Sequence, residues 1–531
     1  MEALPTPTSR YERLRQAWGW ATRTGPRWRS VPPLLLMLLA VALALRLYGV
    51  GWDRVTPLNN GFFHPDERSI YMRVDDMFRL LTKAPGYQAL MQDERFRQVV
   101  PGVPSPSVFL DADKSPLNPH WFPLGTLVIY MLLIVKLALA PIVTMRLEDL
   151  ALAGRTLSAL ADVGTIAMVY VLGRRLYGHG AGLLAAVLVT FAVTHIQHSH
   201  FYRPETFTNL FTLAAFWAML QVWEQRRVRD SALLGLFVGL SFATKVSVLP
   251  LLSPLVVLYG YLLVQALRRS SANERADYLE KVALRALMAG VVAVAVYLFT
   301  TPYALLDFPG FLSWNLGELD VVRHAGTRPY TVQYIGAPKF LYELRQSVVW
   351  GLGLPLGLLA WGGFLATVAL NIRRPRLGQA LLLLWAIPLL LTVGSVEVKF
   401  LRYVFPLMPV FILMGAGIAI QAVGWLGRRS RWLGVSAAGL VGLVVAATVL
   451  YALAFETIYS RPHSAVQASR WINDNLRTDM RILTDNHWDE GIPDLGRYPV
   501  TQLPMFDSDS TRKMEQVATL LAGGDYLVFY S

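Results

Sequence analysis

Long runs of apolar residues, separated by short polar segments, dominate this chain. Runs of this kind begin near residues 31, 121, 154, 180, 206, 231, 250, 282, 348, 378, 400 and 432. A helix needs about 20 mostly apolar residues to cross a bilayer. The pattern therefore predicts an all-α polytopic membrane protein. We interpret the first run as a retained membrane helix, because no small-residue cleavage site follows its Arg-rich flank.

The segments between and after these runs divide the chain into domains. Residues 1–30 form a basic tail, residues 31–455 a membrane domain, and residues 456–531 a small α/β domain. In this last domain residues 464–476 have helical periodicity, and residues 481–485 and 526–530 are typical of buried strands. Because the chain ends on the second of these strands, we expect the domain to continue beyond Ser531. Segments 51–153 and 302–345 are interpreted as loops on the same membrane face as this domain.

Composition and charge agree with a membrane location. Hydrophobic residues make up 54% of the chain and charged residues only 16%, yet the net charge is +13. In so apolar a chain, this excess indicates cationic loops beside a membrane and no nucleic-acid partner. The chain contains no Cys. This excludes disulfides, thiol nucleophiles and Cys-based zinc sites.

Arginine clusters predict the topology, because short basic loops stay in the cytoplasm. They include Arg10, Arg13, Arg15, Arg23, Arg27 and Arg29 in the tail and Arg174, Arg226, Arg268, Arg373 and Arg428 in later loops. This assignment allows one net crossing between residues 51 and 174. We expect residues 121–143, which contain Lys136 and Pro141, to re-enter or to lie along the surface. The prediction is about eleven spans in the cell membrane, with the N-terminus cytoplasmic and the C-terminal domain outside.

The first chemical signal is the sequence His64-Pro65-Asp66-Glu67, directly after the first helix. Pro65 favours a helix start, and the amide dipoles of a first turn keep a nearby carboxylate ionised. We interpret Asp66 as a general base or metal ligand and Glu67 as a residue that orients or contacts the substrate. The alternative is ordinary helix capping.

The second signal is the segment 195–205, which contains three of the nine histidines beside a cation and a carboxylate. Its polar residues are His195, His198, His200, Arg203 and Glu205. A divalent metal is one interpretation. Because the spacing fits no standard metal site, a polar substrate-binding cluster is favoured. Helix capping by Glu205 is again the alternative.

Two cations lie at the outer ends of apolar helices. These are Lys245 and Arg402. Ionised groups in such positions usually have a partner, and two of them predict a site for an anionic lipid phosphate. The alternative is that both side chains extend to the interface without a specific ligand.

These motifs together resemble the GT-C glycosyltransferases. The likeness is greatest to the family 39 protein O-mannosyltransferase-like enzymes and the bacterial lipid A aminoarabinose transferases. It is carried by residues 64–67, 203–205, 301–303, 399–406 and Trp488-Asp489, and covers most of the chain in order. Each motif is short, and the specificity comes from the set of motifs on one membrane face.

The resemblance implies inverting transfer of a sugar from a polyprenyl-phosphate donor to a hydroxyl of a lipid, glycan or protein on the outer face. It implies Asp66 as the base, with Glu67 and Glu205 also catalytic. It further implies substrate contacts by His64, His200, Arg203, Lys245, Tyr303, Lys399, Arg402 and Tyr403. In relatives an Asp often stands where this chain has Glu205. The Trp-Trp-Asp-Tyr-Gly motif of oligosaccharyltransferases is missing, so we do not expect N-glycosylation.

Two other classes compete with the enzyme. A transporter or flippase of a lipid-linked or polar solute tends to place ionisable groups near the bilayer midplane, whereas here they collect at one face. A membrane scaffold would leave the acidic motifs unexplained. The sequence assigns no cofactor and does not fix the sugar, the acceptor, the need for a metal or the oligomeric state.

Overall fold

The structure, a computed structural model, describes residues 32–53, 64–486 and 493–529. The predicted basic tail of residues 1–30 and the motif Trp488-Asp489 lie outside these residues. Each apolar run of the sequence forms a helix. The helices are α2 (Pro33–Leu47), α6 (Thr126–Leu139), α7 (Leu147–Tyr177), α8 (His179–Thr190), α9 (Val193–Ser199), α10 (Pro204–Gln225), α11 (Val228–Thr244), α12 (Leu252–Leu267), α13 (Ala272–Thr300), α17 (Leu354–Arg373), α18 (Leu377–Ser395), α19 (Met408–Arg429) and α20 (Arg431–Glu456).

The described helices confirm a polytopic membrane fold. Seven stretches are long and apolar enough to cross a membrane, or eight if the bent pair α8 and α9 forms one span. This is fewer than the eleven or so crossings expected. Helix α11 has only 17 residues, and α10 carries the polar residues Thr208, Asn209 and Thr212, which are buried inside the bundle. Tertiary packing therefore covers polar positions that hydropathy alone would expose to lipid.

Helix α6 corresponds to the run that we expected not to cross fully. It has 14 residues, about 21 Å of helix, which is less than the apolar thickness of about 30 Å. It packs against α3 (Pro65–Thr82), and Lys136 lies 2.5 Å from Asp75 of that helix. The charge of Lys136 is therefore compensated within the protein.

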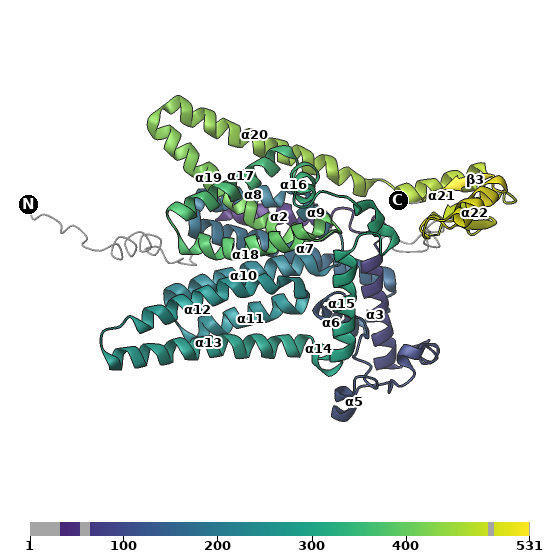
Figure 1. The fold of residues 1–531 in the computed structure, drawn as a ribbon, viewed down its shortest axis with the longest axis horizontal. Coiled ribbons are helices and arrows are strands. Elements are labelled where there is room, and N and C mark those ends of the chain that lie inside the picture. The colour runs from purple at the N-terminus through teal and green to yellow at the C-terminus, as the bar shows by residue number, and fades with distance from the viewer. Residues whose placement is uncertain (1–31, 54–63, 487–492, 530–531) are drawn as a thin grey trace, which may run out of the picture.

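The remaining elements before the C-terminal part connect these helices and gather mainly at one end of the bundle, at the right and lower right of Figure 1. They are α3, α4 (Tyr87–Leu90), η1 (Glu94–Phe96), α5 (Pro106–Leu110), η2 (Val246–Leu251), α14 (Tyr303–Leu306), α15 (Phe308–Arg323), η3 (Pro329–Tyr334), α16 (Leu341–Gln346), η4 (Ser347–Gly351), η5 (Leu401–Tyr403) and η6 (Phe405–Leu407). A separate hydrophobic core joins α3, α6 and α7 beneath them.

The C-terminal part forms the predicted α/β unit, at the same end of the molecule (Figure 1). It consists of η7 (Thr457–Ser460), α21 (Ser464–Asn475), β1 (Ile482–Asp485), β2 (Val500–Leu503), α22 (Thr511–Ala522) and β3 (Tyr526–Val528). The strands are parallel in the order β2-β1-β3. The strand predicted as the second is β3, but Tyr526 and Leu527 are exposed, so the prediction that this strand is buried was wrong. Strand β2 was not predicted, because Thr501 and Gln502 are exposed and break the apolar pattern.

Candidate active site

The two acidic motifs meet at the starts of α3 and α10. Arg203 joins them, because its Nη2 lies 3.1 Å from Asp66 Oδ2 and 3.0 Å from Glu205 Oε1. Its Nη1 lies 3.0 Å from His64 Nε2. Proline occupies the first turn of both helices, and the N-cap residues are His64 and Arg203, without a capping side-chain hydrogen bond. The acids therefore stand in the first turn, and neither is the capping residue.

The two predicted cations complete the group. Arg402 Nη1 lies 3.5 Å from Asp66 Oδ2, and Lys245 Nζ lies 3.2 Å from Glu205 Oε1. Both cations also face the ring of Tyr403, at 5.7 and 5.6 Å from its centre. We call Asp66, Arg203, Glu205, Lys245 and Arg402 the outer charge cluster. Three cations against two carboxylates leave an excess positive charge, which suits an anionic ligand.

Several polar atoms of this group are buried without a hydrogen-bond partner in the described part of the chain. They are His64 Nδ1, Arg203 Nε, Glu205 Oε2 and Arg402 Nε. A buried polar group without a partner costs about 1 to 3 kcal/mol. The side chains of Asp66, Lys245 and Arg402 remain 29%, 21% and 23% exposed. The cluster is therefore accessible and has free hydrogen-bonding capacity.

The charges of the cluster fix the protonation of its first-loop residues. Burial alone would raise the pKa of Asp66, but the positive charges of Arg402 and Arg203 outweigh it and bring the pKa below its usual value. Burial and the charge of Arg203 lower the pKa of His64 to about 3. At neutral pH Asp66 is therefore an ionised carboxylate and His64 a neutral imidazole.

Glu67 lies in different surroundings from Asp66. It is completely buried, and its carboxylate oxygens are 2.8 and 2.6 Å from Nε and Nη2 of Arg155 on α7. Glu67 Oε1 also accepts hydrogen bonds from the Tyr71 hydroxyl and from the backbone N–H of Tyr202. Arg155 in turn binds Asp53 through two contacts of 2.5 and 2.8 Å. We call Asp53, Glu67 and Arg155 the Arg155 clamp.

The Arg155 clamp positions the outer charge cluster. Glu67 follows Asp66 directly, and Tyr202 directly precedes Arg203. The hydrogen bond from the Tyr202 backbone N–H to Glu67 therefore joins the two motifs. Successive helical residues point about 100° apart. This explains why Asp66 is partly exposed while Glu67 has only protein partners. In the described residues Glu67 contacts protein groups alone, which agrees with the orienting role expected from the motif. The catalytic role implied by the resemblance stays a prediction.

A glycine allows the close approach that positions Lys245. Gly125 at the start of α6 donates its backbone N–H to Thr244 O at 3.0 Å. A Cβ atom at this glycine would stand 2.2 Å from the carbonyl oxygens of Ala243 and Thr244. Any side chain would therefore displace the end of α11, and Lys245 with it.

The three histidines of the second motif have different hydrogen-bond and ring partners, although His195 and His198 both contact Phe405. His198 stacks on Phe405 with ring centres 4.1 Å apart. His200 is fully buried, with its ring nitrogens 2.8 and 2.7 Å from the carbonyls of Ile196 and Tyr48. Its ring also stacks on Tyr459. In the described residues no group of three His, Asp or Glu side chains is arranged to hold a metal ion.

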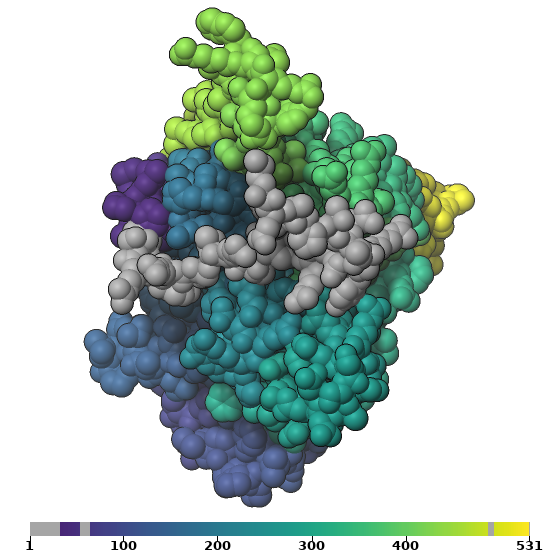
Figure 2. Space-filling model, turned by 90° about the vertical axis from the view of Figure 1, so that its left-hand side faces the viewer, coloured from purple at the N-terminus to yellow at the C-terminus, as the bar shows by residue number. Residues whose placement is uncertain are grey.

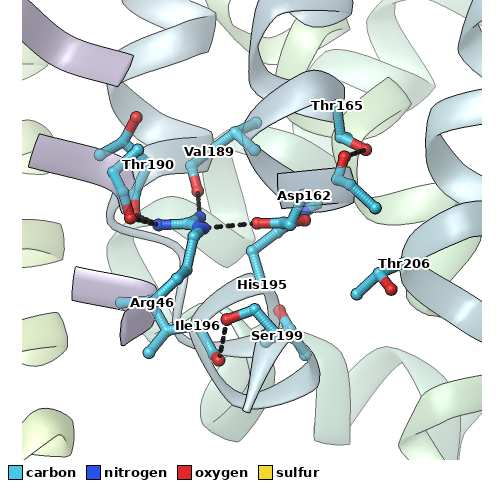
Figure 3. Close-up of polar contacts among 12 residues, drawn as sticks. Arg46, Asp162, Thr165, Val189, Thr190, His195, Ile196, Ser199 and Thr206 are labelled. Atoms are coloured by element: carbon cyan, nitrogen blue, oxygen red, sulfur yellow. Dashed lines mark hydrogen bonds and ion pairs between the residues drawn. The ribbon is translucent and has the colours of Figure 1, made fainter. Parts of the chain in front are cut away.

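His195 belongs to a buried ionic network deeper in the bundle (Figure 3). Its Nδ1 lies 2.7 Å from Asp162 Oδ1, and Asp162 Oδ2 lies 2.7 Å from Arg46 Nε. Arg46 also donates to the carbonyls of Thr190 and Val189. Neither Arg46 nor Asp162 was predicted from the sequence as a site residue. Their charges within apolar runs were the available signal, because such residues are rare and usually paired.

Two further predicted substrate contacts lie in supporting packing. Lys399 is buried and pairs with Glu343 of α16 at 2.7 Å. Tyr303 is buried, and its hydroxyl lies 2.9 Å from Phe109 O and 2.5 Å from Ser115 Oγ. The structure therefore does not place either residue in the outer charge cluster.

A small pocket of about 20 Å³ is lined by residues on either side of Lys245. Ala243 and Val246 on either side of this lysine contribute to its wall, together with Phe122, Leu124, Phe242 and Tyr297. Asn315 of α15 also lines it. The wall is thus mainly apolar, and the pocket lies next to a cation.

Glu318 of α15 is a nearby residue that the sequence did not indicate. Burial raises its pKa, and the negative charge of Asp66 raises it further. The positive charges of Arg402 and Lys245 act in the opposite direction and lower the pKa of Glu318. Its segment carries no local motif, and only the fold brings α15 over the cluster.

Comparison with known proteins supports the resemblance noted from the motifs. A model of the dolichyl-phosphate-mannose-protein mannosyltransferase family matches residues 134–299, which is less than half of the chain. No curated protein sequence matches significantly. Among solved structures, the oligosaccharyltransferase AglB from Archaeoglobus fulgidus with an inhibitory peptide and a dolichol-phosphate superimposes with a TM-score of 0.50 and 14% identity. The apo form of an oligosaccharyltransferase from Archaeoglobus fulgidus superimposes with a TM-score of 0.51 and 12% identity.

Coverage differs between these structures. Each archaeal match covers 88% of this chain but only 64% and 63% of the archaeal chains, so this chain spans less than two thirds of their length. ArnT from Cupriavidus metallidurans bound to undecaprenyl phosphate gives a TM-score of 0.49 and 14% identity, and the match covers 94% of this chain and 90% of ArnT. At such identities the archaeal likeness shows the fold, which is that of the GT-C glycosyltransferases.

Proposed function

We propose that this chain, which has the GT-C fold, is a membrane glycosyltransferase that uses a polyprenyl-phosphate sugar as donor. The acceptor is a hydroxyl group on the outer face of the cell membrane, and the transfer inverts the anomeric centre. The outer charge cluster is the observation that carries this proposal. It places a partly exposed, ionised carboxylate beside three cations whose charge the carboxylates do not fully balance.

The geometry supports a single displacement. Asp66 takes the proton of the acceptor hydroxyl, and the resulting oxygen attacks the anomeric carbon. The bond from that carbon to the phosphate oxygen breaks, and Lys245 and Arg402 stabilise the phosphate that leaves. General base catalysis and placed charges of this kind are the usual sources of rate enhancement in group transfer. Glu205, held by Arg203 and Lys245, has a free Oε2 for a sugar hydroxyl.

Donor binding and base strength are coupled in this arrangement. Arg402 contacts Asp66 at 3.5 Å, which is longer than the contact of 3.1 Å from Arg203. A donor phosphate attracts Arg402, and the loss of that charge from Asp66 raises the pKa of Asp66. The carboxylate then becomes a stronger base when the donor is present.

The comparisons support the donor class in general terms. The name of the matching family includes the donor dolichyl-phosphate-mannose, and the archaeal structure contains a dolichol-phosphate. The transporter alternative has less support, because the residues of the outer charge cluster gather at one end of the bundle. Transporters tend to bind their substrates near the midplane, whereas the buried charges of Arg46 and Asp162 within the bundle are paired with each other.

Arg402→Ala is expected to weaken donor binding by about 10- to 100-fold, since a hydrogen bond to a charged group contributes about 1.5 to 3 kcal/mol. The affinity of the purified protein for a polyprenyl-phosphate sugar measures this effect. Arg345→Ala is the matched control, because Arg345 is exposed and belongs to α16. Unchanged affinity of Arg402→Ala would leave Arg402 as an interfacial side chain without a ligand.

The proposed topology can be checked by labelling, because the natural chain has no Cys. Asp66→Cys should react with a membrane-impermeant maleimide added outside intact cells, and Arg174→Cys should react only after the membrane is opened. Both positions have accessible side chains. The opposite labelling pattern would reverse the orientation and place the proposed reaction on the cytoplasmic face.

A further inference from the structure

Three arginines stand together at the end of the bundle opposite to the outer charge cluster. Glu205 lies at the start of α10, and Arg226 directly follows the end of this helix of 22 residues. Arg269 follows α12, and Arg285 belongs to α13. The guanidinium groups of Arg226 and Arg269 face the ring of Tyr278, at 5.6 and 4.9 Å from its centre. Figure 2 shows this face, with the teal hairpin of α12 and α13 toward the viewer.

The positive charges of this group are not balanced. Among the described residues, ion pairs to carboxylates are formed by other arginines, such as Arg175 with Glu224, and by none of Arg226, Arg269 and Arg285. Arg226 Nη2 donates to the neutral Gln265 Oε1 at 3.0 Å. Burial and the positive charges of Arg285 and Arg269 lower the pKa of Arg226. The arginines therefore repel one another.

Two atoms of the group lack partners. Arg285 is 9% exposed, and its Nη1 is buried without a hydrogen bond to any described residue. The Tyr278 hydroxyl is also buried without a hydrogen bond to any described residue. Buried donors of this kind are unfavourable unless a ligand satisfies them. The planar guanidinium fork matches the oxygens of a phosphate group.

The backbone conformation at Arg226 is also unusual for an arginine. Arg226 is the C-cap of α10 with φ of 54°, in the left-handed region. Glycine is the usual residue at such a helix end, because a side chain is strained there. An arginine at this position therefore holds its charge beside Arg269 and Arg285 in a backbone conformation that is unfavourable for a side chain.

The surroundings favour a lipid. Exposed apolar side chains of α12 and α13 adjoin the arginines along the helix axes, including Leu263, Leu267, Leu284 and Leu287. Helix α13 is also one of the stretches that are apolar enough to cross a membrane. The charges thus lie where an apolar helix surface gives way to polar residues, which is the level of phospholipid headgroups.

We infer that Arg226, Arg269, Arg285 and Tyr278 form a binding site for a phosphate-bearing anion on the membrane face opposite to the outer charge cluster. The ligand chemistry is a phosphate oxygen group held by arginine forks and a phenol hydroxyl. An anionic phospholipid and free phosphate both offer this chemistry, and the adjoining apolar surface favours the phospholipid. This inference does not depend on the proposed glycosyl transfer.

Lipid binding to the full chain, purified in detergent, tests the site. We expect dioleoylphosphatidylglycerol to bind and to raise the thermal midpoint of the natural protein. Arg285→Gln and, separately, Arg226→Gln should weaken this binding by about tenfold or more, the usual effect of losing a hydrogen bond to a charged group. Arg373→Gln removes the exposed arginine that ends α17, and this variant should bind the lipid as the natural protein does. Native mass spectrometry and thermal unfolding provide the two readouts.

The source of the anion is decided by a second arm with inorganic phosphate. If phosphate alone gives the same stabilisation and both variants lose it, the site takes free phosphate. If only the phospholipid stabilises, the ligand is a headgroup. Equal lipid binding by the natural protein, Arg226→Gln and Arg285→Gln would overturn the site, as would an equal loss in Arg373→Gln. Arg226 is only half-buried, so its variant remains informative if Arg285→Gln fails to fold.

Discussion

Asp66→Asn is expected to lower the turnover of sugar transfer by about 10²- to 10⁴-fold, the usual contribution of general base catalysis. Asparagine keeps the size of the side chain and can still contact Arg203, but it cannot accept the acceptor proton. Purified protein, a polyprenyl-phosphate sugar and a mixture of hydroxyl acceptors allow release of the lipid phosphate to be measured. Donor affinity should change far less than turnover, because Lys245 and Arg402 remain.

A capping role for Asp66 predicts a different outcome. Asparagine caps helices nearly as well as aspartate, so the variant would keep near-normal turnover. His64, and not Asp66, is the N-cap of α3, and this already argues against capping. An active Asp66→Asn enzyme would remove Asp66 as the base. If such an enzyme still bound the donor, the proposed donor site would stand while the proposed mechanism failed.

Arg155→Met is expected to reduce stability by about 3 to 5 kcal/mol, because it leaves carboxylates buried without their cation. The side chains of Asp53, Glu67 and Arg155 are at most 2% exposed. The bond between Glu67 and the Tyr202 backbone should also loosen, and with it the spacing of Asp66 and Arg203. The thermal unfolding midpoint in detergent measures the stability loss.

Two further variants separate loss of the buried ion pairs from a general effect of the substitution. Arg95→Met removes a cation whose side chain is 45% exposed and paired with Asp93, and a surface pair of this kind contributes at most about 1 kcal/mol. Adding Asp53→Asn and Glu67→Gln to Arg155→Met removes the unpaired charges and should restore part of the stability. If Arg155→Met unfolds at the midpoint of the natural protein, the Arg155 clamp does not stabilise the fold.

The sequence by itself determined the helices, two of the strands and the residues of the charge cluster. Apolar runs identify membrane helices because the bilayer requires about 20 residues of uniform character. Strands β1 and β3 were recognisable from short segments that contain neighbouring apolar or aromatic residues. Asp66, Arg203, Glu205, Lys245 and Arg402 stood out because charges and prolines at the ends of apolar runs are visible locally.

Only the tertiary structure decided the role that each of these residues can have. Asp66 and Glu67 are neighbours in sequence, yet Arg155, 88 positions after Glu67, pairs with Glu67. His200 and Lys399 looked like site residues, but Tyr48 and Glu343 are their partners, 152 and 56 positions away. Local patterns report periodicity, capping and polarity over a few residues. Which charge is paired and which stays open to a ligand depends on contacts between distant segments, and these exist only once the helices have packed.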